Sequence, residues 1–127
     1  MIKAEALRIG DLVNFHNSPC IITGIDDISC TVGLLNSYNS EDFRRVDDIN
    51  IEPIPLTPEI LEKNGWKRDK LVAYIYGHEA HNIEVICTPN SECMYVTFKG
   101  ETIHRIKYVH ELQRILWALG LDANLKI

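Results

Sequence analysis

Hydrophobic and polar residues alternate in short runs over the first half of the chain, and this spacing predicts β-strands. Residues 28–34 alternate apolar with small or polar residues, and residues 20–25 are mainly β-branched and apolar. Residue types that favour turns separate the runs, as in Gly10-Asp11, Asn17-Ser18-Pro19 and Asp26-Asp27. Several short strands in so small a segment must cover their edges or close on themselves. The pattern therefore predicts a small β-barrel over residues 1–55.

A proline-containing segment, residues 52–56, follows this strand region. Its two prolines lack the N–H donors that a central strand needs, so we expect an extended connector. Thr57 then has the residue type of a helix N-cap, and Pro58 suits the first helical position. Asn64-Gly65 is a typical helix end. The sequence predicts a short helix directly after the connector.

The second half of the chain has two kinds of apolar spacing. Strand-like runs separated by turns predict an antiparallel meander made of residues 71–76, 82–87, 94–98 and 102–106. From Tyr108 the apolar residues recur at helical spacing on one face, and Gly120 ends that pattern. We therefore expect an α+β protein, with the barrel at residues 1–55 and a helix–antiparallel β-meander–helix unit at residues 56–127.

Composition and charge restrict the location and the partners of the chain. Its 127 residues are 46% hydrophobic and 24% charged, as in ordinary globular domains. No apolar run approaches the roughly 20 residues of a membrane-spanning helix, and the first residues lack the apolar stretch of a signal peptide. We therefore expect a cytoplasmic protein with no membrane partner.

The net charge of −5 is unevenly distributed. Residues 1–56 contain 4 basic and 9 acidic side chains, whereas residues 57–127 contain 9 of each. Affinity for nucleic acid comes largely from neutralising phosphates, so this distribution disfavours a nucleic-acid partner. A weak nucleic-acid interaction through the C-terminal sheet stays open as an alternative, and would need one face to carry Lys67, Arg68, Lys70, Lys99, Arg105 and Lys107.

Histidines and cysteines are the candidates for a metal site. Residues 77–81 read Gly-His-Glu-Ala-His, but the metalloprotease motif spaces its histidines by four residues on a helix, and here the spacing is three between strands. His78, His81, Cys87 and Cys93 carry the donor atoms for zinc. Zinc sites typically place two to four residues between paired cysteines, and five separate Cys87 from Cys93. We expect a polar hairpin turn at the histidines, without a metal or another cofactor.

Cysteine catalysis requires a thiolate held beside a histidine. The four cysteines, Cys20, Cys30, Cys87 and Cys93, each lie in or beside a strand-like run. In a reducing compartment such residues are typically small buried hydrophobic side chains. We predict no catalytic residue, and a small hydrolase or transferase using a cysteine or histidine stays the competing hypothesis.

Two groups of residues are candidates for binding a protein partner. Tyr38, Phe43, Arg44 and Arg45 combine aromatic and arginine side chains, which are enriched at interfaces, although Phe43 could instead belong to the core. His110, Arg114 and Trp117 follow each other at helical spacing beside the apolar stripe of the last helix. Trp117 could be an exposed anchor for a partner, or it could widen the buried face.

Three segments together resemble a family of short uncharacterised proteins from gut bacteria, their prophages and other mobile elements. They are residues 6–13 (Ala-Leu-Arg-Ile-Gly-Asp-Leu-Val), residues 51–61 with Asn64-Gly65-Trp66, and residues 108–113 with Trp117-Ala118-Leu119. The resemblance implies a bacterial or phage origin and transfers no functional residue. Separately, residues 9–13 are similar to the first strand of many SH3-like barrels, which implies that fold for residues 1–55. From these observations we expect a noncatalytic protein-binding or adaptor protein.

Overall fold

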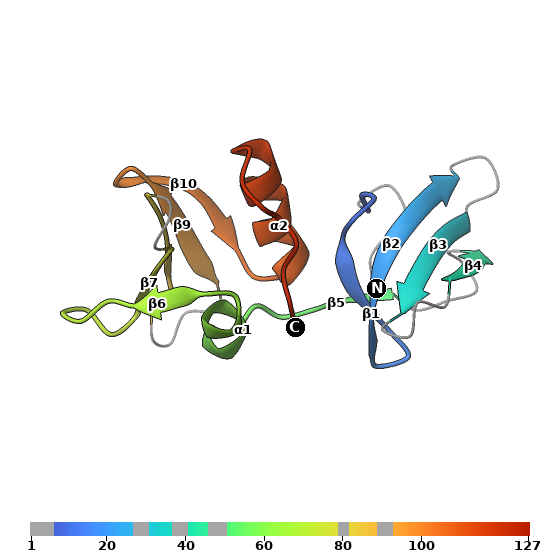
Figure 1. The fold of residues 1–127 in the computed structure, drawn as a ribbon, viewed down its shortest axis with the longest axis horizontal. Helices are drawn as coiled ribbons and strands as arrows, with labels where there is room; N and C mark the ends of the chain where they lie inside the picture. The colour runs from blue at the N-terminus through green and yellow to red at the C-terminus, as the bar shows by residue number, and fades with distance from the viewer. Residues whose placement is uncertain (1–6, 27–30, 37–40, 46–50, 79–81, 89–92) are drawn as a thin grey trace. The chain divides into compact units, whose positions relative to one another are not determined.

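The computed structural model of the chain describes residues 7–26, 31–36, 41–45, 51–78, 82–88 and 93–127 (Figure 1). These residues belong to two compact units, an N-terminal unit (1–54) and a C-terminal unit (55–127). Each unit contains one antiparallel sheet, and the C-terminal unit also contains both helices (Figure 1). The predicted α+β class is confirmed.

The sheet of the N-terminal unit has five strands in the order β4-β3-β2-β1-β5. The strands are β1 (Leu12–Phe15), β2 (Ser18–Asp26), β3 (Thr31–Asn36), β4 (Glu41–Arg45) and β5 (Ile51–Pro53). His16 and Asn17 both have positive φ angles and form a two-residue turn between β1 and β2. In the part of the chain that the structure describes, β4 and β5 are the two edges, so the sheet is not closed.

Strand β5 differs from the expected connector. Residues 51–53 pair with β1, with Val13 opposite Pro53 and Phe15 opposite Ile51. An edge strand needs hydrogen-bond partners on one side only, so a proline is tolerated there. The prediction excluded a central strand correctly, but Glu52 and Pro53 belong to an edge strand.

A tight turn fixes the entry into β1. The carboxylate of Asp11 accepts a hydrogen bond from the N–H of Arg8 at 2.8 Å, and Asp11 is buried. Gly10, with φ 95°, adopts the left-handed conformation and donates its N–H to the carbonyl of Ile22 at 2.7 Å. The Gly-Asp pair therefore joins the segment before β1 to β2.

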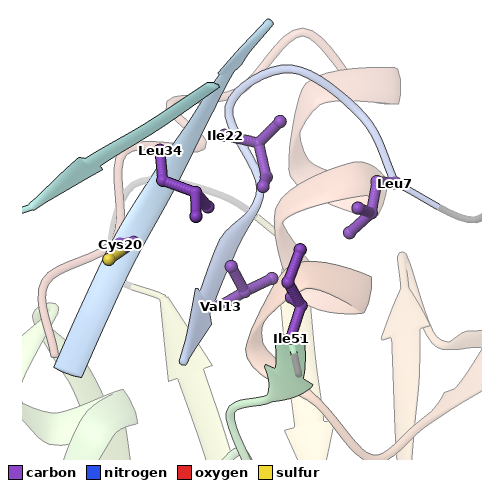
Figure 2. Close-up of a cluster of buried hydrophobic side chains, with 6 residues drawn as sticks. All are labelled: Leu7, Val13, Cys20, Ile22, Leu34 and Ile51. Carbon is purple, nitrogen blue, oxygen red and sulfur yellow. The ribbon is translucent and has the colours of Figure 1, made fainter. Parts of the chain in front are cut away.

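The core of the N-terminal unit is a cluster of six buried side chains that point toward one another (Figure 2): Leu7, Val13, Cys20, Ile22, Leu34 and Ile51. They come from the entry turn and from strands β1, β2, β3 and β5. Phe15 and Ile25 pack against this cluster. Cys20 is thus one of the small buried hydrophobic residues that the sequence predicts.

The sheet of the C-terminal unit is a meander in the order β10-β9-β8-β7-β6. Its strands are β6 (Trp66–Arg68), β7 (Ile75–His78), β8 (Ile83–Ile86), β9 (Met94–Phe98) and β10 (Glu101–Ile106). The register of the pairs places Trp66, Tyr76, Val85 and Val96 on one face, and all four are buried. The edge strand β10 has an irregularity between Thr102 and His104.

Residues 71–74 form a turn, and not the strand that their apolar character predicts. The Asp69 carboxylate accepts hydrogen bonds from the N–H groups of Leu71 (2.8 Å) and Val72 (3.0 Å). These bonds replace the backbone pairing of a strand and lower the pKa of Asp69. Leu71 is 94% exposed as a result. A local side-chain acceptor therefore overrides the β-propensity of the segment.

Both helices begin where the sequence predicts. Helix α1 (Pro58–Lys63) has Thr57 as its N-cap, whose hydroxyl accepts from the N–H of Ile60 at 3.3 Å. Helix α2 (Val109–Ala118) follows Tyr108, and the Glu111 carboxylate accepts from the N–H groups of Lys107 and Tyr108, both at 3.0 Å. Gly65 (φ 84°) and Gly120 (φ 73°) follow the helix ends in the left-handed conformation.

Replacing Thr57 with alanine tests the contribution of this N-cap to stability. We expect Thr57→Ala to lower the free energy of unfolding of the C-terminal unit by about 1 kcal/mol, because the Ile60 N–H loses its acceptor. Urea unfolding followed by tryptophan fluorescence measures this, since both tryptophans, Trp66 and Trp117, belong to this unit. Thr57→Ser keeps the hydroxyl and should retain most of the stability. Equal midpoints for the two variants would contradict the assignment.

Candidate functional site

The exposed flank of α2 carries the most prominent side chain among the sequence-predicted binding residues. Trp117 is 78% exposed, near the end of the helix. Arg114, one turn earlier, is partly buried. The helix is anchored by Val109, Leu112 and Leu116, all buried. Trp117 therefore does not widen the buried face, and a well-packed helix presents its indole to solvent.

His110 differs from the surface residue that helical spacing suggests. It is only 7% exposed, and its ring stacks on that of Tyr108 with the centroids 5.9 Å apart. Gln113 is buried as well. The buried stripe of α2 is therefore wider than its apolar residues, and His110 belongs to that stripe. Of the three predicted residues, Trp117 and Arg114 supply accessible surface.

The other predicted binding group is only partly described. Phe43, Arg44 and Arg45 lie on β4, where their backbones pair with Gly33, Val32 and Thr31. Tyr38 and the side chains of β4 lie outside the described residues. These three residues occupy an edge strand of the N-terminal sheet.

The residues considered for zinc are separated along the strands. The N–H of Cys87 donates to the carbonyl of Tyr74 at 2.8 Å, so Cys87 lies beside the start of β7. His78 lies four residues after Tyr74, which separates the two residues by roughly 13 Å in an extended chain. His78 instead packs edge-on against Trp66 with centroids 5.3 Å apart, whereas His81 lies outside the described residues. Among the described side chains, no group of three or more His, Cys, Asp or Glu is arranged to hold a metal ion.

Two cysteine thiols are held in their protonated form. Burial raises the pKa of Cys87 to about 11 and also raises the pKa of Cys20. The Cys87 thiol contacts the sulfur of Met94 at 3.5 Å, and the Cys20 thiol donates to the carbonyl of Ser18 at 3.6 Å. Because the thiolate is the nucleophile, both environments oppose nucleophilic catalysis by these residues.

The basic residues of the C-terminal sheet do not share one face. Strand register places Lys67 and Arg105 on the face opposite Trp66, where Arg105 lies over the ring of Tyr95 at 5.6 Å. Arg68 lies on the same face as Trp66 and pairs with Tyr76 of β7. The Nε–H of Arg68 donates to the hydroxyl of Tyr76 at 3.3 Å. Lys99 lies in the β9–β10 turn. The register therefore separates Lys67 and Arg105 from Arg68.

A cavity of about 190 Å³ lies within the C-terminal unit, beside Trp66 and the end of α2. It is lined by Asn64, Trp66, His78, Leu116, Leu121, Asp122, Asn124 and Leu125. The lining combines aromatic and aliphatic side chains with amide, carboxylate and imidazole groups. Such a mixture suits an apolar side chain with a polar backbone beside it.

One wall of this cavity is the tail, residues 121–127, which the side chain of Asn64 holds. The Asn64 amide donates to the carbonyl of Lys126 at 2.7 Å, and its oxygen accepts from the N–H of Lys126 at 2.6 Å. Sequence reasoning assigned Asn64 only to the end of α1. It missed this contact because the two residues are 62 positions apart and no local pattern connects them.

The comparisons with known proteins give no relative: no protein-family model matches the chain, and neither does any of the curated proteins or solved structures compared with it. Among the residues that the structure describes, no helix is long and apolar enough to cross a membrane. The function is therefore argued from the geometry of the chain itself.

The reactivity of Cys87 tests the burial of its thiol. With a pKa of about 11, roughly one ten-thousandth of the thiol is ionised at pH 7. The rate of alkylation by iodoacetamide should therefore rise about tenfold per pH unit from pH 8 to pH 10, as measured by mass spectrometry of the Cys87 peptide. The same peptide in urea is the control, and its rate should level off above about pH 9. A plateau near pH 8.5 in the folded chain would contradict the assignment.

Proposed function

We propose that the chain is a noncatalytic protein-binding or adaptor protein of a bacterial mobile element or prophage, and that it contacts its partner through Trp117. The observation that carries the proposal is the 78% exposure of this side chain on a helix that is anchored by buried side chains. Tryptophan is among the residue types that dominate binding energy at interfaces.

The surroundings of Trp117 support its role as an anchor. Leu112 and Leu116 fix the position of α2, so the indole is presented on a rigid element and loses little conformational freedom on binding. Arg114 lies one turn away and supplies the other residue type that is enriched at binding hot spots. An exposed tryptophan contributes little to folding, so its presence is better explained by binding.

The proposal includes an SH3-like architecture for the N-terminal unit. Two features support it: β5 returns antiparallel beside β1, and the nine-residue β2 has an irregular register between Ile22 and Gly24 where it can bend. Barrels of this kind commonly bind peptides or nucleic acids, but a fold does not by itself determine a function. The mobile-element origin rests on the sequence resemblance of residues 6–13, of residues 51–61 with 64–66, and of residues 108–113 with 117–119.

Recovery of the tagged chain from its host, followed by native mass spectrometry, tests this function. We expect a complex of defined stoichiometry with one protein, and we expect Trp117→Ala to reduce its recovery at least tenfold because the anchor is lost. Leu71→Ala is the matched control, since it also removes an exposed apolar side chain and should leave recovery unchanged.

Circular dichroism of both variants should match that of the unchanged chain, because neither side chain is packed. A complex that survives Trp117→Ala would show that the partner binds elsewhere. Recovery of a bare chain from cells that contain the native partner would contradict the protein-binding function.

A further inference from the structure

The tail differs from the rest of the C-terminal unit in how it is held. Residues 121–127 belong to no helix or strand, and they alternate between half-buried and exposed positions. The half-buried residues are Leu121, Ala123, Leu125 and Ile127. The segment thus lies with one side inward. A tight turn bends it at Asn124, where the N–H of Leu125 donates to the carbonyl of Ala123 at 3.0 Å. The tail follows Gly120, whose positive φ turns the chain away from α2.

Asn64 forms hydrogen bonds with main-chain atoms of the tail, and not with its side chains. Its amide nitrogen donates both to the carbonyl of Lys126 (2.7 Å) and to that of Ile60 in α1 (2.8 Å), while its oxygen accepts from the N–H of Lys126 (2.6 Å). The bond to Ile60 fixes the orientation of the amide. A residue whose N–H and C=O both pair with one amide is recognised whatever its side chain.

Two further side chains contact the tail in the same way. Gln113 of α2 donates to the carbonyl of Ala123 at 3.2 Å, and the ammonium of Lys63 donates to the carbonyl of Ile127. These bonds, like those of Asn64, end on main-chain atoms. A different segment with the same alternation of inward and outward side chains could therefore make the same hydrogen bonds.

The apolar contacts of the tail leave space unfilled. Leu121 and Leu125 line a cavity of about 190 Å³ together with Trp66, His78 and Leu116. This volume corresponds to roughly six water molecules at about 30 Å³ each. A larger inward side chain, such as phenylalanine at the position of Leu125, would fill part of this space and gain contact with Trp66.

We propose that the surface formed by Asn64, Gln113 and the Trp66 cavity, the tail site, binds an apolar segment of a partner protein in the backbone conformation that residues 121–127 adopt. Residues 121–127 occupy this site in the free chain and are displaced when the partner segment binds. The inference rests on the proposed protein-binding function and specifies a second contact, separate from Trp117. The partner segment is recognised through its main-chain N–H and C=O groups and by a large apolar residue at the position of Leu125.

The test uses the full chain and a synthetic peptide with the sequence of residues 120–127 in which the residue matching Leu125 is phenylalanine. Lys126→Pro removes the N–H that Asn64 accepts and loosens the tail, whereas Lys126→Ala keeps the N–H and is the matched control. We expect isothermal titration to give about tenfold tighter peptide binding for Lys126→Pro than for Lys126→Ala, because the internal competitor is weakened. Adding the peptide should also shift the NMR signals of the tail amides toward random-coil positions.

Asn64→Ala should weaken peptide binding about tenfold, because the two-way hydrogen bond is lost. Trp117→Ala should leave it unchanged, so loss of the tail site and loss of the proposed function are distinguishable. Equal affinities of the two Lys126 variants, or tail signals that do not move at saturating peptide, would overturn the inference. Failure of the peptide to bind a folded Lys126→Pro chain would also overturn the inference, even if the Trp117-dependent complex forms.

Discussion

The side-chain amide of Asn64 is the contact on which the arrangement of the C-terminal unit depends. It ends α1 through Ile60, it directly precedes the left-handed Gly65 that leads into β6, and it holds Lys126. With the Lys126 N–H on its oxygen, a single amide satisfies three backbone groups from segments that lie far apart in the sequence. Strand β6 begins two residues after Asn64, at the buried Trp66, and Trp66 lines the cavity. The same amide therefore also fixes one wall of the cavity.

The packing of α2 leaves accessible binding surfaces on the C-terminal unit. The helix buries His110 and Gln113 in addition to its apolar residues. Gln113 uses this position to reach the tail through the carbonyl of Ala123. Trp117 lies on the same side of α2 as Gln113, one turn further along, where the side chain is exposed. One side of this short helix thus holds the tail and, near its end, presents an aromatic anchor.

Much of the fold could be predicted from the sequence where local chemistry decides it. Thr57 and Pro58 define the start of α1 because capping depends on neighbouring residues only. The apolar spacing from Tyr108 predicts α2, because helical periodicity is also a local property of the sequence. The strand predicted at residues 71–76 was wrong at residues 71–74, because the Asp69 carboxylate accepts hydrogen bonds from the N–H groups of Leu71 and Val72. Apolar content alone does not reveal that competition.

The candidate site could be predicted only in part. Helical spacing placed Trp117 and His110 on the same flank, but it cannot show how far along that flank the helix is covered. His110 is buried, whereas Trp117, two turns later, is exposed. The contact between Asn64 and Lys126 depends on chain closure over 62 residues and leaves no periodic signal.

The irregular register of β10 also affects how separate molecules meet. An edge strand exposes a row of N–H and C=O groups on which a foreign strand can pair and start aggregation. The shift between Thr102 and His104 interrupts that row, and the exposed charges of Glu101 and Arg105 lie on either side of it. The β10 edge of the meander is therefore a poor template for growth from one chain to the next.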